Sequence, residues 1–150
     1  MKQISALLVL FILLFTSCNK GQTASEDGLN WESNLEQAID QAKKENKAVL
    51  VNFTGSDWCS WCIRLSSEVF QQKDFEEYAK KSLILVMLDF PRNIKQSSET
   101  QAYNRSLAQK YGIQGFPTIL IFNSEGKLAG QTGYLPGGPN KYIANIQSYL

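Results

Sequence analysis

Three short runs of apolar residues constrain the fold of this chain more than any other feature of its sequence. They occupy residues 48–53, 83–88 and 118–122. Runs of this length between turn residues are typical of strands buried on both faces. A turn at residues 123–126 joins the third run to a further strand pattern at 127–132, which indicates a β-hairpin.

The segments between these strands carry the spacing of amphipathic helices. Helices are predicted over residues 35–46, 59–70, 75–81 and 99–111, and a last one opens at Pro139. Ser33 and Glu36 have the spacing of a capping box, which predicts that Ser33 caps the first helix. Strands alternating with helices, followed by a hairpin and a helix, predict an α/β domain with one mixed sheet.

The absence of histidine excludes more chemistry than the rest of the composition does. A chain without histidine can form no Ser-His or Cys-His hydrolase site and no histidine metal site. The 15 Lys and Arg residues balance 14 Asp and Glu, so no basic surface for nucleic acid is expected. With 150 residues, 43% of them hydrophobic, the chain is long enough for one domain with a core.

The first 17 residues are expected to be a targeting signal. Lys2 precedes an apolar run at residues 6–15, which is too short for a membrane-spanning helix of about 20 residues. Small residues and then Cys18 follow, so the segment resembles a bacterial lipoprotein signal with a lipidated cysteine. Phe15 departs from the aliphatic residue usual in such signals. The alternative is an ordinary signal peptide with an incidental cysteine.

This interpretation divides the chain into a signal peptide at 1–17, a tether at 18–30 and one domain at 31–150. Residues 19–28 are mostly small and polar, and they have little to bury. Asn19 is not the aspartate that resembles an inner-membrane retention signal. We therefore expect a lipid-anchored protein of the outer membrane that faces the periplasm.

Cys59 and Cys62 are the residues on which the predicted chemistry rests. Two cysteines three positions apart at the start of a helix can form and break a disulfide. Unpaired N–H groups at a helix N-terminus favour a thiolate, which is the attacking species in disulfide exchange. Cys59 is therefore the predicted nucleophile. Cys62, one turn inside the helix and more shielded, is the predicted resolving thiol.

Three other interpretations of this cysteine pair stay open. A zinc site would need two further ligands, which a chain without histidine and with Cys18 far away does not offer, so no metal is expected. A structural disulfide would enclose only two residues and remove little entropy from the unfolded chain. A degenerate binding module is the third interpretation, although both sulfurs are present.

The motif Asp-Trp-Cys-Ser-Trp-Cys at residues 57–62, together with Gly-Phe-Pro-Thr at 115–118, resembles the thioredoxin superfamily. Within it, the chain is most similar to secreted bacterial members and to the periplasmic domain of transmembrane reductant transporters. The resemblance covers residues 31–150. It implies the thioredoxin fold, with a mixed central sheet flanked by helices on both faces.

The resemblance also implies a groove for an extended substrate segment beside Cys59. Pro117 would be a cis-proline facing the active site, and the backbone of the preceding residue would pair with the substrate. The substrate-binding residues implied in this way are Trp58, Ser60, Trp61, Phe116, Pro117, Gly133 and Tyr134.

Two departures from the usual thioredoxin pattern affect the expected chemistry. Asn52 stands where thioredoxins usually have a buried acidic residue that accepts the proton of the resolving thiol. Deprotonation of Cys62 must then use water or another carboxylate, such as Asp57, or it is slower. The dipeptide Ser60-Trp61 replaces the usual Gly-Pro, and this dipeptide tunes the redox potential across the superfamily.

We therefore expect a thiol–disulfide oxidoreductase of the cell envelope that needs no cofactor and acts as a monomer. The expected substrates are cysteine-containing exported proteins, which it would reduce. The expected electron donor is a membrane protein of the reductant-transporter type. The alternatives are an oxidase or isomerase acting in the opposite direction, or a thioredoxin-fold binding module whose disulfide is structural.

Overall fold

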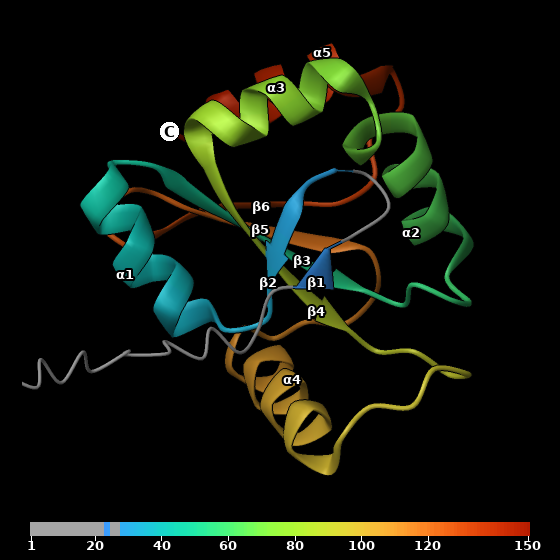
Figure 1. The fold of residues 1–150 in the computed structure, drawn as a ribbon. Coiled ribbons are helices and arrows are strands. Elements are labelled where there is room, and N and C mark those ends of the chain that lie inside the picture. Colours follow the sequence, from blue (N-terminus) through green and yellow to red (C-terminus); the bar gives the residue numbers. More distant parts are fainter. Residues whose placement is uncertain (1–22, 25–27) are drawn as a thin grey trace, which may run out of the picture.

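A computed structural model of the chain describes residues 23–24 and 28–150 (Figure 1). The predicted signal peptide and Cys18 lie outside the described residues. The described strands form one six-stranded sheet in the order β1-β2-β4-β3-β5-β6. Their bounds are β1 Thr23–Ala24, β2 Asn30–Glu32, β3 Ala48–Thr54, β4 Leu83–Asp89, β5 Thr118–Phe122 and β6 Leu128–Thr132.

Strand β3 is the centre of the sheet, and all seven of its residues are buried. It pairs in parallel with β4 and antiparallel with β5, while β2 adds a second parallel pairing with β4. The hairpin of β5 and β6 completes the sheet on the other side. The predicted mixed sheet and its three apolar strands are therefore confirmed.

Helices cover both faces of this sheet, as predicted (Figure 1). Their bounds are α1 Leu35–Glu45, α2 Ser60–Leu65, α3 Lys73–Ser82, α4 Ser98–Lys110 and α5 Gly138–Gln147, with a five-residue π-helix, η1, at Ser66–Phe70. α2, η1, α3 and α5 contribute to one buried cluster, and α1 and α4 contribute to the other. In the described part of the chain, no helix combines the length and apolar character needed to cross a bilayer.

The N-terminal edge of the sheet begins within the segment predicted as a tether. Asn30 is the first residue of β2, and Leu29 before it is buried. Trp31 is 1% exposed, and its ring packs edge-on against Phe70 at 5.3 Å between centroids. The sequence predicts no strand here, because one large apolar residue among polar neighbours gives no strand pattern.

The cap of α1 differs from the predicted one. Asn34, not Ser33, is the N-cap, and its side chain accepts a hydrogen bond of 2.8 Å from the backbone N–H of Gln37. Glu36 does not complete a capping box with Ser33; its carboxylate accepts a hydrogen bond from the Tyr103 hydroxyl. The Ser33 cap prediction was wrong because the helix starts one residue later, where asparagine serves equally well as an N-cap.

The segment predicted as one helix over 59–70 is two elements. α2 ends at Leu65, and η1 continues with π-helical bonding, as in the 2.9 Å bond from the N–H of Gln71 to the carbonyl of Ser66. The wider turn leaves the consecutive residues Val69 and Phe70 both buried. A periodicity of 3.6 residues does not predict such a turn.

Candidate active site

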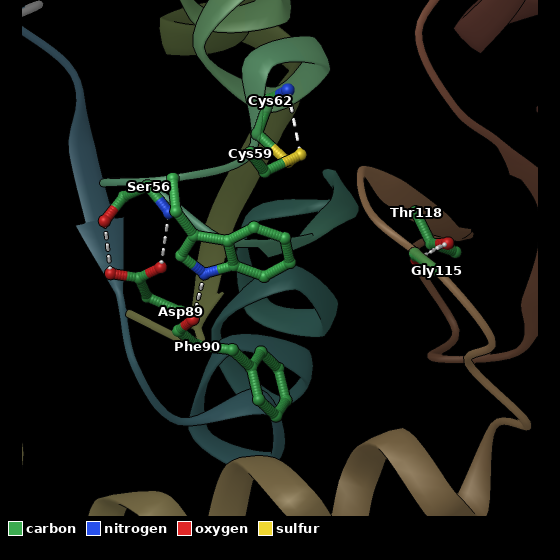
Figure 2. The surroundings of a disulfide bond; sticks show 8 residues. Ser56, Cys59, Cys62, Asp89, Phe90, Gly115 and Thr118 are labelled. Carbon is green, nitrogen blue, oxygen red and sulfur yellow. Dashed lines mark hydrogen bonds between the residues drawn. A yellow bond between two sulfur atoms is a disulfide. The ribbon is translucent and has the colours of Figure 1, made fainter. Parts of the chain in front are cut away.

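Cys59 and Cys62 lie where the chain leaves the central strand and enters α2, and they form a disulfide (Figure 2). Their Cα atoms are 5.2 Å apart. Cys59 is the N-cap of α2, and its Sγ accepts a hydrogen bond of 3.2 Å from the backbone N–H of Cys62. An N–H group directed at this sulfur also stabilises a thiolate there after reduction.

The two cysteines differ little in exposure. Cys59 is 7% exposed and Cys62 is 5% exposed. The greater shielding predicted for Cys62 is therefore small, and the position of Cys59 at the helix start is what separates the two sulfurs.

Trp58, which precedes Cys59 in the chain, forms a wall with Phe90, Arg92 and Phe116, which we call the Trp58 wall. The indole Nε1 donates a 2.8 Å hydrogen bond to the backbone carbonyl of Phe90 (Figure 2). The Phe116 ring lies edge-on to Trp58 at 6.1 Å and stacks on Phe90 at 4.9 Å. The Arg92 guanidinium lies 3.9 Å from the centroid of Trp58. Trp58 remains 36% exposed, as a groove wall requires.

The loop that carries Arg92 is attached to the cysteine loop by Asp57. Its carboxylate accepts hydrogen bonds of 2.9 and 2.6 Å from the backbone N–H groups of Arg92 and Asn93. These bonds lower the pKa of Asp57, the bond from Arg92 most strongly. Nearby, the Asp89 carboxylate accepts bonds of 2.9 and 2.6 Å from the N–H and hydroxyl of Ser56. Two carboxylates thus hold the residues before the first cysteine.

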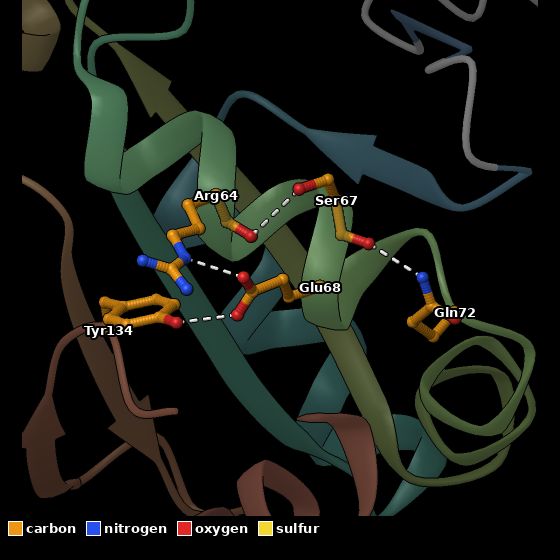
Figure 3. Close-up of polar contacts among 5 residues, drawn as sticks. All are labelled: Arg64, Ser67, Glu68, Gln72 and Tyr134. Atoms are coloured by element: carbon orange, nitrogen blue, oxygen red, sulfur yellow. Dashed lines mark hydrogen bonds and ion pairs between the residues drawn. The ribbon is translucent and has the colours of Figure 1, made fainter. Parts of the chain in front are cut away.

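Trp61, which precedes Cys62 in the chain, forms a second wall with Arg64, Glu68 and Tyr134, which we call the Trp61 wall. The Trp61 and Tyr134 rings are 5.1 Å apart, and the Arg64 guanidinium lies 5.6 and 5.4 Å from their centroids. Glu68 accepts hydrogen bonds of 2.6 Å from both the Tyr134 hydroxyl and Arg64 Nε (Figure 3). These two donors, Tyr134 first, lower the pKa of Glu68. Trp61 itself is 52% exposed.

The loop before β5 supplies the third part of the site. The Phe116–Pro117 peptide bond is cis, as the thioredoxin resemblance implies. The Thr118 hydroxyl donates a 2.7 Å bond to the Gly115 carbonyl and closes this turn (Figure 2). A Cβ added to Gly133 would stand 3.2 Å from the carbonyl oxygen of Pro117, so the two predicted groove loops come close together. The remaining predicted residue, Ser60, is exposed at the first position of α2.

Asn52 lies on the central strand and is 5% exposed. Within the described residues, its amide oxygen has no hydrogen-bond partner. Asn52 and Cys62 line the same hollow of about 310 Å³. Asp57, predicted as a possible proton acceptor for Cys62, is not among the lining residues and bonds instead to the loop at 92–93.

The residues that support the two walls are not predicted by the sequence pattern. Phe90 and Arg92 lie more than 30 residues after Trp58, and nothing in their local pattern connects them to it. Arg64 and Glu68 have the spacing of a helical ion pair, which is common on exposed helices and does not by itself indicate a site.

Comparison with known proteins agrees with this geometry. The family model of the thioredoxin-like domain matches residues 35–145. The chain belongs to this family. It is 36% identical over 122 residues to the disulfide bond reductase DsbH of Chlamydia pneumoniae, a match that covers 81% of this chain and 73% of that protein. A solved structure of a DsbH oxidoreductase matches with a TM-score of 0.75 and 35% identity, covering 81% of this chain and 84% of that one.

The chain also matches a part of a larger protein. The thiol:disulfide interchange protein DsbD of Photorhabdus laumondii is 31% identical over 98 residues, which cover 65% of this chain and 15% of that protein. The chain is thus homologous to thiol–disulfide oxidoreductases, and its Cys59–Cys62 pair stands at disulfide distance. The resemblance inferred from the sequence motifs is confirmed.

Proposed function

We propose that this protein reduces disulfides of exported proteins in the bacterial cell envelope. The observation that carries the proposal is the Cys59–Cys62 disulfide at the start of α2, with the Cys59 sulfur accepting a backbone N–H. The identity to a protein named as a disulfide bond reductase favours the reducing direction. Two aromatic walls border the sulfur pair, and they supply apolar surface for a polypeptide substrate.

In this proposal Cys59 is the nucleophile and Cys62 the resolving thiol. The Cys59 thiolate attacks a substrate disulfide, whose S–S bond breaks, and one substrate sulfur leaves with the electron pair as a thiolate. Cys62 then attacks the Cys59 sulfur in the mixed disulfide and releases the second substrate thiolate. Two electrons pass from the dithiol to the substrate, and a membrane electron donor of the reductant-transporter type restores the dithiol.

The activity is tested by reduction of insulin disulfides by the full-length protein with dithiothreitol as the electron source. We expect Cys59→Ser to lower the rate to that of dithiothreitol alone. Cys62→Ser should retain the first attack and accumulate a mixed disulfide with insulin, visible by non-reducing electrophoresis. If both variants match the wild type, the disulfide is structural and the chain is a binding module.

The direction of electron flow is tested by equilibrating the Cys59–Cys62 pair with glutathione buffers. A reductase should have a potential near the thioredoxin value of about −270 mV, whereas an oxidase would lie near about −120 mV. An isomerase would show an intermediate potential and would refold a scrambled disulfide protein without net reduction.

The proposed location rests on the sequence before the domain. We place Cys18 as the lipidated residue of a monomeric protein anchored to the outer membrane and facing the periplasm, with residues 18–30 as its tether. Fractionation of bacterial cells that produce the full chain tests this. The wild type should sediment with outer membranes, and Cys18→Ser should not. Recovery of the wild type with inner membranes would correct the sorting assignment, and a soluble wild type would overturn the anchor.

A further inference from the structure

The hollow beside Cys62 connects the resolving cysteine with the protein surface. Its buried lining includes Asn52, Thr54 and Cys62. Its outer lining includes Ser67 and Gln71, which are exposed. The volume of about 310 Å³ is enough for several water molecules, each of which occupies about 30 Å³ in the liquid.

Asn52 contributes to this hollow a polar group that lacks a hydrogen-bond partner. Its amide oxygen is buried, and no described residue donates a hydrogen bond to it. Leaving a buried carbonyl oxygen unpaired is costly, so such atoms in native proteins are usually satisfied by protein donors or by ordered water. Asn52 lines the hollow, so water held there is the partner available to its amide.

We infer that this hollow is the proton exit of the resolving step: water held against Asn52 accepts the proton of the Cys62 thiol and passes it to solvent. This inference rests on the proposed function, because only a protein that exchanges disulfides has to deprotonate Cys62. Asn52 acts as a positioning residue, since an amide orients water but cannot take up the proton at physiological pH.

The ionisable groups on the segments around the hollow form hydrogen bonds or ion pairs with other residues. No carboxylate or amine is among the residues that line the hollow. Arg64 and Glu68, on the helical segment beside it, bind each other, and Glu68 also binds Tyr134. Asp57 binds backbone N–H groups of the neighbouring loop, and Asp89 at the end of β4 binds Ser56. Water is therefore the acceptor that the site offers to the thiol.

The step balances without a further reactant. In the mixed disulfide, the S–H bond of Cys62 breaks and its proton passes to water in the hollow. The Cys62 thiolate forms an S–S bond with Cys59, and the bond between Cys59 and the substrate breaks. The electron pair leaves on the substrate sulfur, which is reduced, while the Cys59–Cys62 pair is oxidised.

The experiment mixes the reduced full-length protein with dithiobis(nitrobenzoate) and follows nitrothiobenzoate release by stopped-flow absorbance from pH 5 to pH 9. The first phase reports attack by Cys59 and tests the proposed function. The second phase reports attack by Cys62. We expect the wild-type second phase to rise about tenfold per pH unit below the thiol pKa, because the thiolate fraction of a thiol that exchanges its proton with solvent rises about tenfold per pH unit there.

Two variants of the hollow provide the decisive comparison. Asn52→Leu removes the water-binding amide, and Ser66→Leu fills the hollow from the helical side at a half-buried position. Each should slow the second phase about tenfold and leave the first within about twofold, the scale of losing one assisted proton transfer. Asn52→Asp supplies an internal base, so its second phase should no longer follow a single thiol ionisation.

A matched control separates this effect from loss of stability. Asn145 also has a buried amide oxygen without a partner in the described chain, but it does not line the hollow, so Asn145→Leu should leave both phases unchanged. The inference is overturned if both Leu variants at the hollow keep the wild-type second phase, or if Asn145→Leu slows it equally. A wild type without a first phase would instead refute the proposed function.

Discussion

The two aromatic walls beside the disulfide contain similar side chains but are anchored differently. In the Trp58 wall, the indole N–H donates to a backbone carbonyl, and the indole lies edge-on to Phe116, which stacks on Phe90. The carboxylate of Asp57 holds the adjoining loop through backbone N–H groups. Each of these hydrogen bonds therefore has a main-chain atom as one partner, and the Arg92 guanidinium adds a side-chain contact with the indole.

In the Trp61 wall, side chains supply the polar contacts. Glu68 joins Arg64 to Tyr134, and the ion pair of Arg64 and Glu68 is exposed to solvent. Exposed ion pairs contribute little and are screened by salt, whereas hydrogen bonds to the main chain depend on the fold as a whole. We therefore expect the structure of the Trp58 wall to depend on the fold, and the contacts of the Trp61 wall to change with the pH and ionic strength of the solution.

The largest expected effect follows from removing the two tryptophans in turn. Trp58→Ala loses a hydrogen bond and packed ring contacts, and should cost about 2–3 kcal/mol in the free energy of unfolding. Trp61→Ala removes a ring that is already 52% exposed, and should cost less than about 1 kcal/mol. Urea denaturation of both oxidised variants checks this difference. Equal losses would contradict the division of the walls into a scaffold part and a peripheral part.

A smaller effect is expected from crowding the Trp58 wall without removing any of its residues. A Cβ added to Gly55 would stand 2.5 Å from the Trp58 ring, so Gly55→Ala must displace the indole. We expect a loss of about 1–2 kcal/mol, together with weaker insulin reduction. Gly115→Ala is the matched control, since a Cβ there meets nothing within 4 Å. A Gly55→Ala variant as stable as Gly115→Ala would show that the indole position is adaptable.

The parts of the molecule that were predictable from sequence are those specified by local patterns. The central strand is a run of mostly apolar, β-prone residues, and Asn46 ends the first helix in a left-handed conformation close to the predicted position. The C-x-x-C pair and the Phe116–Pro117 turn carry motifs that can be read within a few residues. Each of these features can be predicted without knowing which distant residues contact it.

The features that were missed depend on contacts between distant segments. Trp31 becomes a core residue only because Phe70 lies beside it, and Trp58 is held by the carbonyl of Phe90. The hollow beside Cys62 also combines two regions, since its lining comes from the central strands and from the segment around η1. A sequence pattern shows that Asn52 is not an acid, but only the fold shows what surrounds it.

The smallest expected effect distinguishes the walls by their response to pH and salt. Hydrogen bonds from Tyr134 and Arg64 lower the pKa of Glu68 below its ordinary value of 4.5. Their contribution is thus fully present above pH 4.5 and is lost as the pH falls through the lower value of the folded protein. We expect the ring protons of Tyr134 and Trp61 to shift in this acidic range by NMR, while Glu68→Gln, which keeps an acceptor, removes the transition.

The dependence of activity on salt concentration tests the Arg64–Glu68 contact independently. Raising ionic strength at neutral pH should weaken the Arg64–Glu68 pair and change kcat/KM for insulin by no more than about threefold. The Glu68→Gln variant should show less of this dependence, because it has no ion pair to screen. The indole N–H resonance of Trp58 should stay constant throughout, since its acceptor is a main-chain carbonyl. A Trp58 shift as large as that of Trp61 would mean that the two walls move together, and that the groove responds to the solution as one unit.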